Sequence, residues 1–221
     1  MSAQKKQPKS GSADSFRTRA IHVGNDVDPT TGAVIPPVHF ASTFEQPAAG
    51  EWGAFDYSRS GNPTRSQMQM TLASLEGAVG SLAFSSGMAA IHCVTMMLKT
   101  GDHVVAGCDL YGGAYRLLHK VCNRSGVDVT LVDMTDASAV SAAINENTKL
   151  VWAETIGNPR LSIPNLRELA DVAHGKGALI GVDNTFGTPV LIRPLEHGID
   201  IVMHSATKYL GGHSDCLGGT L

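Results

Sequence analysis

The stretch KLVWAETIGNPRLSIPNLRELADVAHGKGALIGV, residues 149–182, contains two short apolar runs separated by a longer segment of mixed character. The runs Lys149–Ala153 and Ala178–Val182 have the length and the unbroken apolar character of buried strands. Between them, Asn165–His174 has the length and pattern of a helix. A strand, a helix and a second strand in this order indicate two parallel strands with the helix packed on one face.

The same alternation continues in both directions along the chain. Further strands are predicted at Ser81–Phe84, His103–Ala106, Val127–Val132 and Ile199–Met203. Further helices are predicted at Met88–Lys99, Ala114–Asn123 and Asp136–Asn145. The sequence therefore predicts an α/β fold with three layers, α/β/α, in which helices cover both faces of a mostly parallel sheet.

Three segments differ in character. Residues 1–15 are rich in Ser, Lys and Gln without an apolar core, which predicts a disordered tail and no signal peptide. Residues 16–62 are rich in Gly, Pro, Thr and aromatic side chains, which predicts an irregular arm that packs on a neighbouring subunit. Residues 63–221 form the regular domain, whose first helix is expected to be capped by Thr64 and to end near Gly77 or Gly80.

The composition narrows the classes of function. The chain has 221 residues with 43% hydrophobic and 17% charged side chains and a net charge of −3, so neither nucleic acid nor an anionic membrane is an expected partner. No apolar stretch is long enough for a membrane span, and a cytoplasmic protein is expected. The four cysteines show no zinc-type spacing, so no metal site is predicted and the thiols are expected to be reduced and mostly buried.

Ligands of parallel α/β sheets bind beyond the carboxyl ends of the strands. In this chain the segments that directly follow the apolar runs are unusually polar. They are Ser85–Met88, Asp109–Gly113, Glu154–Pro159, Asp183–Thr185 and His204–Lys208. The candidate site is therefore expected among these segments.

Two of these segments suit an anionic, aromatic cofactor. Ser86, Gly87 and Met88 begin a helix, and a helix N-terminus binds phosphate, although an ordinary serine cap is the commoner reading of this motif alone. Asp183 follows a buried strand, where a carboxylate needs a partner such as a protonated pyridine nitrogen; otherwise it is a turn residue. Glu154 is expected only to be hydrogen-bonded near the site.

The other two segments add a nucleophile and a ring. Lys208 follows a strand closely enough to be partly desolvated, which makes an amine nucleophilic, although an isolated lysine is more often a surface residue. Ser205 and Thr207 beside it can bind phosphate oxygens. Tyr111, in a glycine-flanked loop, can stack on a flat ring or simply anchor the loop. A lysine, an acid, a phosphate-binding helix start and an aromatic ring together are what pyridoxal 5′-phosphate (PLP) requires from a protein.

Five segments in order resemble the Cys/Met-metabolism (trans-sulfuration) family of PLP-dependent enzymes. They are Tyr57–Thr64, Ser86–Ile91, Asp109–Gly113, Asp183–Phe186 and His204–His213. The resemblance runs from about Thr18 to Leu221. It implies the fold-type I, aspartate-aminotransferase-like architecture, and it leads us to expect that a C-terminal domain with a substrate-binding arginine is missing from this chain.

The resemblance also assigns roles. Lys208 would hold PLP as a Schiff base and transfer protons, Asp183 would pair with the pyridinium nitrogen, and Tyr111 would stack on the ring. The phosphate would be bound by Ser86, Gly87, Met88, Ser205 and Thr207. Asn158 would lie near the substrate carboxylate and the phenolic oxygen of PLP. Tyr57 and Arg59 would reach the phosphate of a neighbouring subunit, which implies a homodimer or homotetramer with shared active sites.

The reaction is less constrained than the cofactor. Asp56 beside Tyr57, and the segment Tyr111–Leu117, look most like cystathionine gamma-synthase, and Asp56, Tyr57 and Asn158 are candidate contacts of an amino-acid substrate. The expected reaction is replacement of the γ-substituent of an O-acylhomoserine by cysteine. Elimination by a cystathionine or methionine gamma-lyase and sulfhydrylation of O-acylhomoserine stay open, as does a chain that binds PLP without turnover. A beta-lyase is the least favoured alternative.

Overall fold

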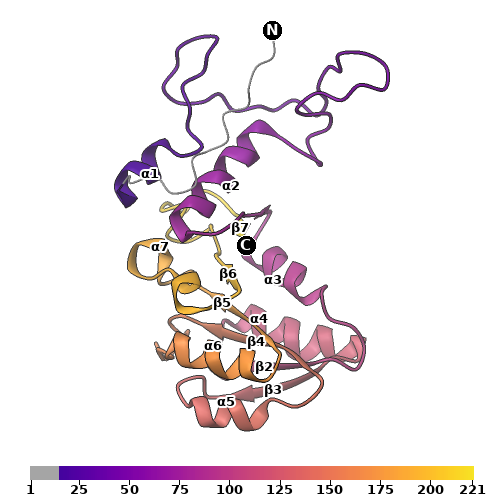
Figure 1. Ribbon diagram of the computed structural model, residues 1–221, viewed down its shortest axis with the longest axis vertical. Helices are drawn as coiled ribbons and strands as arrows, with labels where there is room; N and C mark the ends of the chain where they lie inside the picture. Colours follow the sequence, from indigo (N-terminus) through magenta and orange to yellow (C-terminus); the bar gives the residue numbers. More distant parts are fainter. Residues whose placement is uncertain (1–14) are drawn as a thin grey trace. The chain divides into compact units, whose positions relative to one another are not determined.

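The computed structural model of the protein describes residues 15–221 (Figure 1). It divides into two compact units, the first ending at Leu75 and the second formed by Glu76–Leu221. The predicted disordered tail lies outside the described residues except for Ser15.

The first unit contains a helix that the sequence analysis missed. Helix α1, Phe16–His22, lies within the segment predicted to be irregular, and that prediction is wrong over these seven residues. The helix begins there because Ser15 caps it: the Ser15 hydroxyl oxygen accepts a hydrogen bond from the N–H of Thr18 at 3.2 Å. The remainder of the arm, up to residue 62, consists of loops with short bridges such as Thr43 to Tyr57.

Helix α2, Pro63–Glu76, begins two residues earlier than predicted, because a cap at Thr64 would place the first helical residue at Arg65. Its cap is Asn62, whose side-chain oxygen accepts from the N–H of Thr64 at 2.9 Å. The Thr64 hydroxyl was predicted to be the cap, but it instead accepts a hydrogen bond from the N–H of His39 at 2.9 Å. The predicted end is confirmed: Gly77 follows with φ +73°, the left-handed conformation that favours glycine after a helix.

The second unit is built on a five-stranded sheet in which every neighbouring pair is parallel. Its strands are β2 His103–Gly107, β3 Asp128–Val132, β4 Thr148–Glu154, β5 Leu179–Asp183 and β6 Ile201–Met203, in the order β3-β2-β4-β5-β6. The parallel sheet and five of its predicted strands are thus confirmed. The predicted strand at residues 81–84 lies outside this sheet: β1, Ala83–Phe84, pairs antiparallel with β7, Gly219–Thr220.

Helices connect the strands as the alternating pattern predicts. They are α3 Gly87–Thr95, α4 Gly112–Arg116, α5 Ala137–Ala143, α6 Leu166–Gly175 and α7 Thr188–Leu191. Three further turns of helix are η1 Leu117–Cys122, a π-helix that continues α4, and the 3-10 helices η2 Asn123–Ser125 and η3 Pro194–His197.

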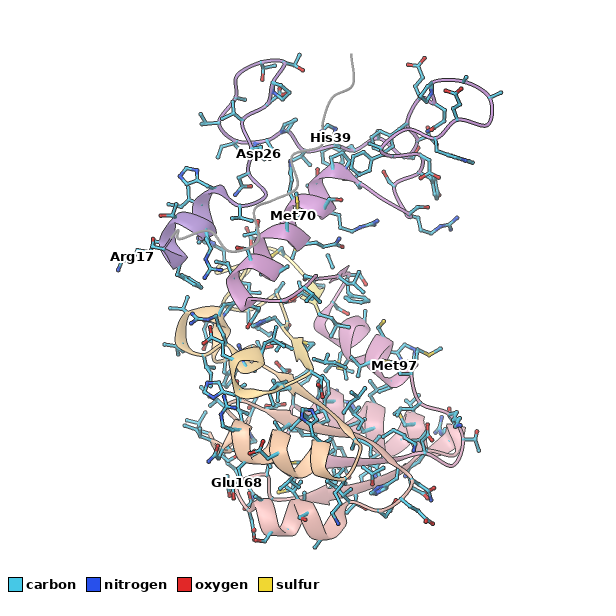
Figure 2. All side chains as sticks on the ribbon, in the orientation of Figure 1. Arg17, Asp26, His39, Met70, Met97 and Glu168 are labelled. Atoms are coloured by element: carbon cyan, nitrogen blue, oxygen red, sulfur yellow. The ribbon has the colours of Figure 1, made fainter. Side chains whose placement is uncertain are left out.

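Alternate residues of each central strand pack on opposite faces of the sheet. In β4, Val151 and Ala153 belong to one buried cluster together with residues of α5 and α6, while Leu150 and Trp152 belong to another with residues of α3 and α4. The predicted three-layer arrangement is therefore confirmed, and Figure 1 shows α5 and α6 beside the sheet. The outer face of α6 carries exposed charges such as Glu168 (Figure 2).

Gly181 in β5 makes room for the largest fully buried side chain of the sheet. Trp152 is 1% exposed, and a Cβ atom built on Gly181 would lie 2.7 Å from Cζ3 of its ring. We expect Gly181→Ala to lower the free energy of unfolding by about 1–3 kcal/mol, because a close-packed core cannot absorb an added methyl group without strain. Chemical denaturation measures this change. Gly175→Ala is the control, since a Cβ there meets nothing within 4 Å, and an equal loss in both proteins would contradict the packing argument.

The predicted burial of the cysteines is wrong for three of the four. Only Cys122 is buried, whereas Cys93, Cys108 and Cys216 are exposed. Cys93 is exposed because α3 turns Ala90, Ile91 and Val94 toward the core and leaves Cys93 on the opposite side.

Within residues 15–221, no three His, Cys, Asp or Glu side chains are grouped so as to hold a metal ion. No helix in that range is long and apolar enough to span a membrane.

Candidate active site

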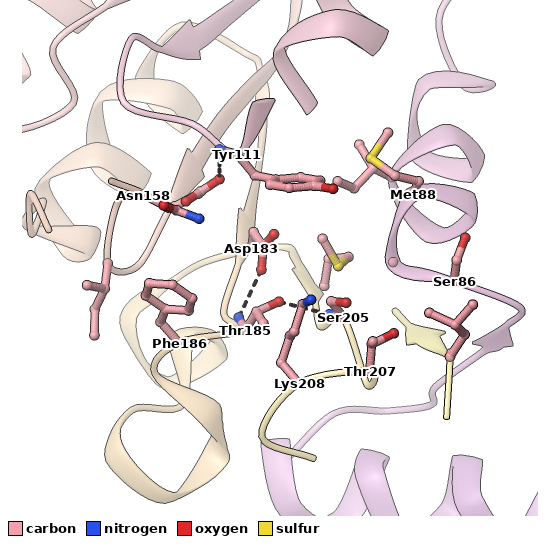
Figure 3. Close-up of a pocket in the computed structure, with 16 residues that line it drawn as sticks. Ser86, Met88, Tyr111, Asn158, Asp183, Thr185, Phe186, Ser205, Thr207 and Lys208 are labelled. Atoms are coloured by element: carbon pink, nitrogen blue, oxygen red, sulfur yellow. Dashed lines mark hydrogen bonds between the residues drawn. The ribbon is translucent and has the colours of Figure 1, made fainter. Parts of the chain in front are cut away.

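The connections of the sheet reverse direction between β2 and β4. The chain leaves β2 toward the edge strand β3, and it leaves β4 toward β5 on the other side, so the carboxyl ends of β2 and β4 flank a topological switch point. A pocket of about 260 Å³ lies at these carboxyl ends (Figure 3). All nine predicted site residues of the second unit line it: Ser86, Gly87, Met88, Tyr111, Asn158, Asp183, Ser205, Thr207 and Lys208.

Lys208 reaches the pocket from the turn after β6. Its N–H donates to the carbonyl of Ser205 at 3.1 Å, and its carbonyl accepts from the N–H of Gly212 at 2.8 Å, so the turn is tightly closed. The side chain is exposed rather than partly desolvated as predicted. Among the described residues, no carboxylate lies within ion-pair distance of the amine, which points into the pocket (Figure 3).

Asp183 is a buried carboxylate that forms no ion pair with any residue in the described part of the chain. It ends β5, and its Oδ1 accepts from the N–H of Thr185 at 2.9 Å. Burial raises the pKa of this carboxyl, and the hydrogen bonds from Thr185 and the nearby His204 only partly oppose that rise. A buried charge is costly unless it is paired. A protonated pyridine nitrogen facing this carboxylate supplies the missing cation, so the pocket fits PLP at this point.

The start of α3 forms a second end of the pocket. The Ser86 hydroxyl oxygen accepts from the N–H of Ala89 at 3.1 Å, which leaves its proton free for an acceptor in the pocket. A Cβ on Gly87 would lie 2.9 Å from Cβ of Ser205, so this helix start packs directly on the segment before Lys208. Unpaired N–H groups and the positive end of a helix suit a phosphate.

Thr207 is less available for phosphate than its neighbours. Its hydroxyl donates to the carbonyl of Gly218 at 3.2 Å and accepts from the N–H of the same residue at 3.1 Å. A hydroxyl has one proton, so Thr207 cannot donate to Gly218 and to a phosphate oxygen at the same time.

Tyr111 and Asn158 lie on the segments that follow β2 and β4. The Tyr111 side chain is 46% exposed and its ring lies along the pocket, where a flat cofactor could stack on it (Figure 3). The N–H of Tyr111 donates to Oε1 of Glu154 at 2.5 Å. Asn158 lines the same pocket from the segment after β4.

Glu154 and Thr185 belong to the site although neither was assigned a role in it. Glu154 is 8% exposed and lines the pocket, and burial, together with the charges of Asp183 and Asp109, raises its pKa to about 8 against the opposing hydrogen bond from Tyr111. One signal was present in the sequence: Glu154 ends one apolar strand just as Asp183 ends the next, and the two are register partners. Thr185 binds Asp183, and its hydroxyl accepts from the N–H of Ser205 at 2.8 Å.

Three predicted site residues, Asp56, Tyr57 and Arg59, are not among those that line the pocket. All three belong to the first unit, where the guanidinium of Arg59 lies 4.9 Å from the ring centre of Tyr57. Their predicted roles toward cofactor and substrate therefore stay predictions.

Comparison with known proteins agrees with this geometry. Residues 17–221 match the sequence profile of the Cys/Met metabolism PLP-dependent enzymes. The chain is 48% identical to "Cystathionine beta-lyase MetC" of Bacillus subtilis over 92% of this chain and 52% of that protein. It is 47% identical to "Probable cystathionine gamma-synthase" of Herpetosiphon aurantiacus over 93% of this chain and 65% of that protein. The chain spans about half the length of most of the curated relatives that it matches.

Solved structures give the same result. The crystal structure of metB from Corynebacterium glutamicum superposes with a TM-score of 0.92 at 45% identity, covering 94% of this chain and 55% of that one. Cystathionine gamma-lyase from Lactobacillus plantarum, complexed with L-serine, superposes with a TM-score of 0.90 at 44% identity, covering 94% and 54%. With the fold-type I architecture of these structures and a matching family profile over nearly its whole length, the chain belongs to the Cys/Met metabolism family of PLP-dependent trans-sulfuration enzymes.

Proposed function

We propose that this chain carries the cofactor site of a cystathionine gamma-synthase-like enzyme. The reaction joins an O-acylhomoserine and cysteine, forms cystathionine with a new bond between the sulfur and the γ-carbon, and releases the acyl group as a carboxylic acid. The observation that carries the cofactor assignment is the convergence of the Lys208 amine and the unpaired, buried Asp183 carboxylate on one pocket. The choice of reaction rests on Asp56 beside Tyr57 and on the segment Tyr111–Leu117.

In this proposal each pocket residue has a separate task. Bound PLP supplies an electron-withdrawing ring that stabilises negative charge on the substrate. Asp183 holds a proton on the ring nitrogen, and Ser86, Ser205 and the start of α3 bind the phosphate. The Lys208 amine attaches the cofactor and moves the proton of the substrate α-carbon. Tyr111 and Asn158 orient the ring and the substrate carboxylate from the segments after β2 and β4.

The proposal includes a neighbouring subunit. Large apolar side chains of the first unit are exposed in the single chain, among them Phe40 at 94% and Trp52 at 76%. A partner subunit that covers them would be brought close to Tyr57 and Arg59, which we propose to contact the phosphate of the partner's site. Small amino acids are the proposed substrates, and the composition favours neither nucleic acid nor membrane as a partner.

Elimination is the second candidate reaction. Relatives at 46–49% identity carry the names cystathionine beta-lyase and cystathionine gamma-lyase, so identity alone does not separate synthase from lyase. These reactions release ammonia and a 2-oxo acid. Sulfhydrylation of O-acylhomoserine is a further alternative on the same residues.

A substrate panel on the PLP-loaded protein tests the reaction. We expect cystathionine to form from O-acylhomoserine plus cysteine, measured by mass spectrometry, and little 2-oxo acid to form from cystathionine alone. Rapid release of 2-oxo acid from cystathionine would overturn the synthase in favour of a lyase. Borohydride trapping of PLP on Lys208 without turnover of any substrate would reduce the proposal to cofactor binding.

A further inference from the structure

Two acidic residues lie on either side of the switch point, one near the end of β2 and one at the end of β4. Asp109 is the second residue after β2, and Glu154 is the last residue of β4. Each would be expected to stabilise the segment that follows its own strand. The side chain of each one binds the segment that follows the other strand, and Glu154 also interacts with the backbone of Asn158 in the segment after its own strand.

Glu154 holds the segment after β2. A backbone N–H can only donate, so the 2.5 Å contact fixes a carboxyl oxygen of Glu154 as the acceptor for Tyr111. The ring of Tyr111 is constrained separately: a Cβ on Gly113 would overlap the edge of that ring and would lie 2.7 Å from the sulfur of Met88. Glu154 thus holds the backbone of Tyr111, while the close packing beside Gly113 limits the position of its ring.

Asp109 holds the segment after β4. The Ser162 hydroxyl donates to Oδ2 of Asp109 at 2.7 Å, and the N–H of Arg160 donates to Oδ1 at 3.3 Å. The turn also closes on itself, since the N–H of Gly157 donates to the carbonyl of Ser162 at 2.8 Å. A Cβ on Gly157 would overlap Oδ2 of Asp109, so the carboxylate lies directly against the backbone beside Asn158.

The charges of the two acids are compatible with this arrangement. Burial raises the pKa of the Asp109 carboxyl, but the hydrogen bonds from Ser162 and Arg160 outweigh it and leave the pKa below its ordinary value. The pKa of Glu154 is about 8. At neutral pH one acid is therefore ionised and the other mostly neutral. This limits the repulsion among Asp109, Glu154 and Asp183.

We propose that Asp109 and Glu154 form a reciprocal clamp that fixes the two segments carrying Tyr111 and Asn158. They are positioning residues, because each acts through a backbone that it binds. The consequence for PLP rests on the proposed function, which gives Tyr111 and Asn158 their roles at the ring. The clamp itself does not depend on PLP and can be tested without it.

Hydrogen exchange of the cofactor-free protein tests the clamp directly. We expect the Tyr111 amide to exchange about tenfold faster or more in Glu154→Ala and in Glu154→Met, because its acceptor is gone. Glu154→Met fills a similar volume and serves where the alanine protein does not fold. Glu154→Gln keeps an acceptor oxygen and should restore slow exchange. In Asp109→Ala, hydrogen exchange of the amides within residues 157–162 should become faster. In Asp109→Asn, the exchange rates should stay closer to those of the original protein.

Asp133→Ala is the matched control. Asp133 also follows a strand and accepts a backbone N–H, that of Thr135 at 2.9 Å, but the hydrogen bonds of its side chain stay within its own segment. We expect its removal to leave the exchange of Tyr111 unchanged. An unchanged Tyr111 rate in Glu154→Ala and Glu154→Met, or equal acceleration in Asp133→Ala, overturns the clamp.

PLP binding to the same proteins separates the clamp from the proposed function. We expect the dissociation constant for PLP, measured by absorbance titration, to rise about tenfold in Glu154→Met and to stay within about twofold in Glu154→Gln. Faster exchange together with unchanged PLP affinity would support the clamp and overturn the assigned role of Tyr111. Restored PLP affinity in Glu154→Gln would indicate that Glu154 acts by positioning Tyr111. A general loss of stability would instead appear as a lower melting temperature in every Glu154 variant.

Discussion

Lys208→Ala should lose all covalent attachment of PLP to the protein. A Schiff base requires an amine within reach of the cofactor, and Lys208 is the one lysine among the residues that line the pocket in the described part of the chain. Borohydride reduction followed by intact mass measurement and peptide mapping checks this outcome. The original protein should carry one PLP on the peptide that contains Lys208, and the alanine protein none.

Lys176→Ala is the control for this experiment. Lys176 is exposed just after α6 and does not line the pocket, so its removal should leave the mass adduct and the visible absorbance of the protein unchanged. A pocket-specific adduct that survives in Lys208→Ala would show that another amine attaches the cofactor, and the assignment of Lys208 would be wrong.

Asp183→Asn should change stability and cofactor affinity in opposite directions. Without PLP, the buried Asp183 has a raised pKa, so the folded protein keeps a proton that the unfolded chain releases. Its contribution to the free energy of unfolding therefore falls as the pH rises above the ordinary carboxyl pKa. Asparagine removes that penalty and can still accept the N–H of Thr185. We expect the cofactor-free Asp183→Asn protein to be more stable at pH 8 by roughly 1–3 kcal/mol.

The same substitution should weaken PLP binding on the order of a hundredfold or more, since it removes one partner of a buried charged pair. Urea denaturation at pH 5 and pH 8 measures the first effect, and absorbance titration the second. The stability difference should be smaller at pH 5. Asp171→Asn, on the exposed side of α6, should change neither quantity. A destabilised Asp183→Asn apoprotein at pH 8, or one with full PLP affinity, would contradict the role given to this carboxylate.

The central strands could be predicted because they are buried on both faces. Every residue of β2 is buried, and such a strand appears in sequence as an unbroken apolar run. Helix boundaries were less predictable. Thr64 and Asn62 are both residue types that cap helices. Asn62 is the cap because the Thr64 hydroxyl accepts a hydrogen bond from His39, which lies 25 positions away in sequence. Helix α1 was missed because its seven residues carry no buried position that would produce a helical pattern.

The candidate site could be predicted as a set of residues but not as a network. The rule that ligands bind beyond the strand ends selected the five segments that contain all nine predicted pocket residues, and the family resemblance then assigned Asn158 its place among them. The hydrogen bond from the N–H of Tyr111 to Glu154 joins residues 43 positions apart, and no local sequence pattern predicts it. The exposure of Lys208 also escaped prediction, because closeness to a strand in sequence does not determine how deeply the following turn is covered.

The buried carboxylate of Asp183 leads us to expect that the vitamin B6 supply of the cell affects the lifetime of this protein. A ligand that binds only the folded state stabilises it by about 2.7 kcal/mol when its concentration is a hundred times the dissociation constant. Cells short of vitamin B6 therefore hold a larger unfolded fraction for proteases to degrade. The abundance of the protein should therefore fall when vitamin B6 is scarce.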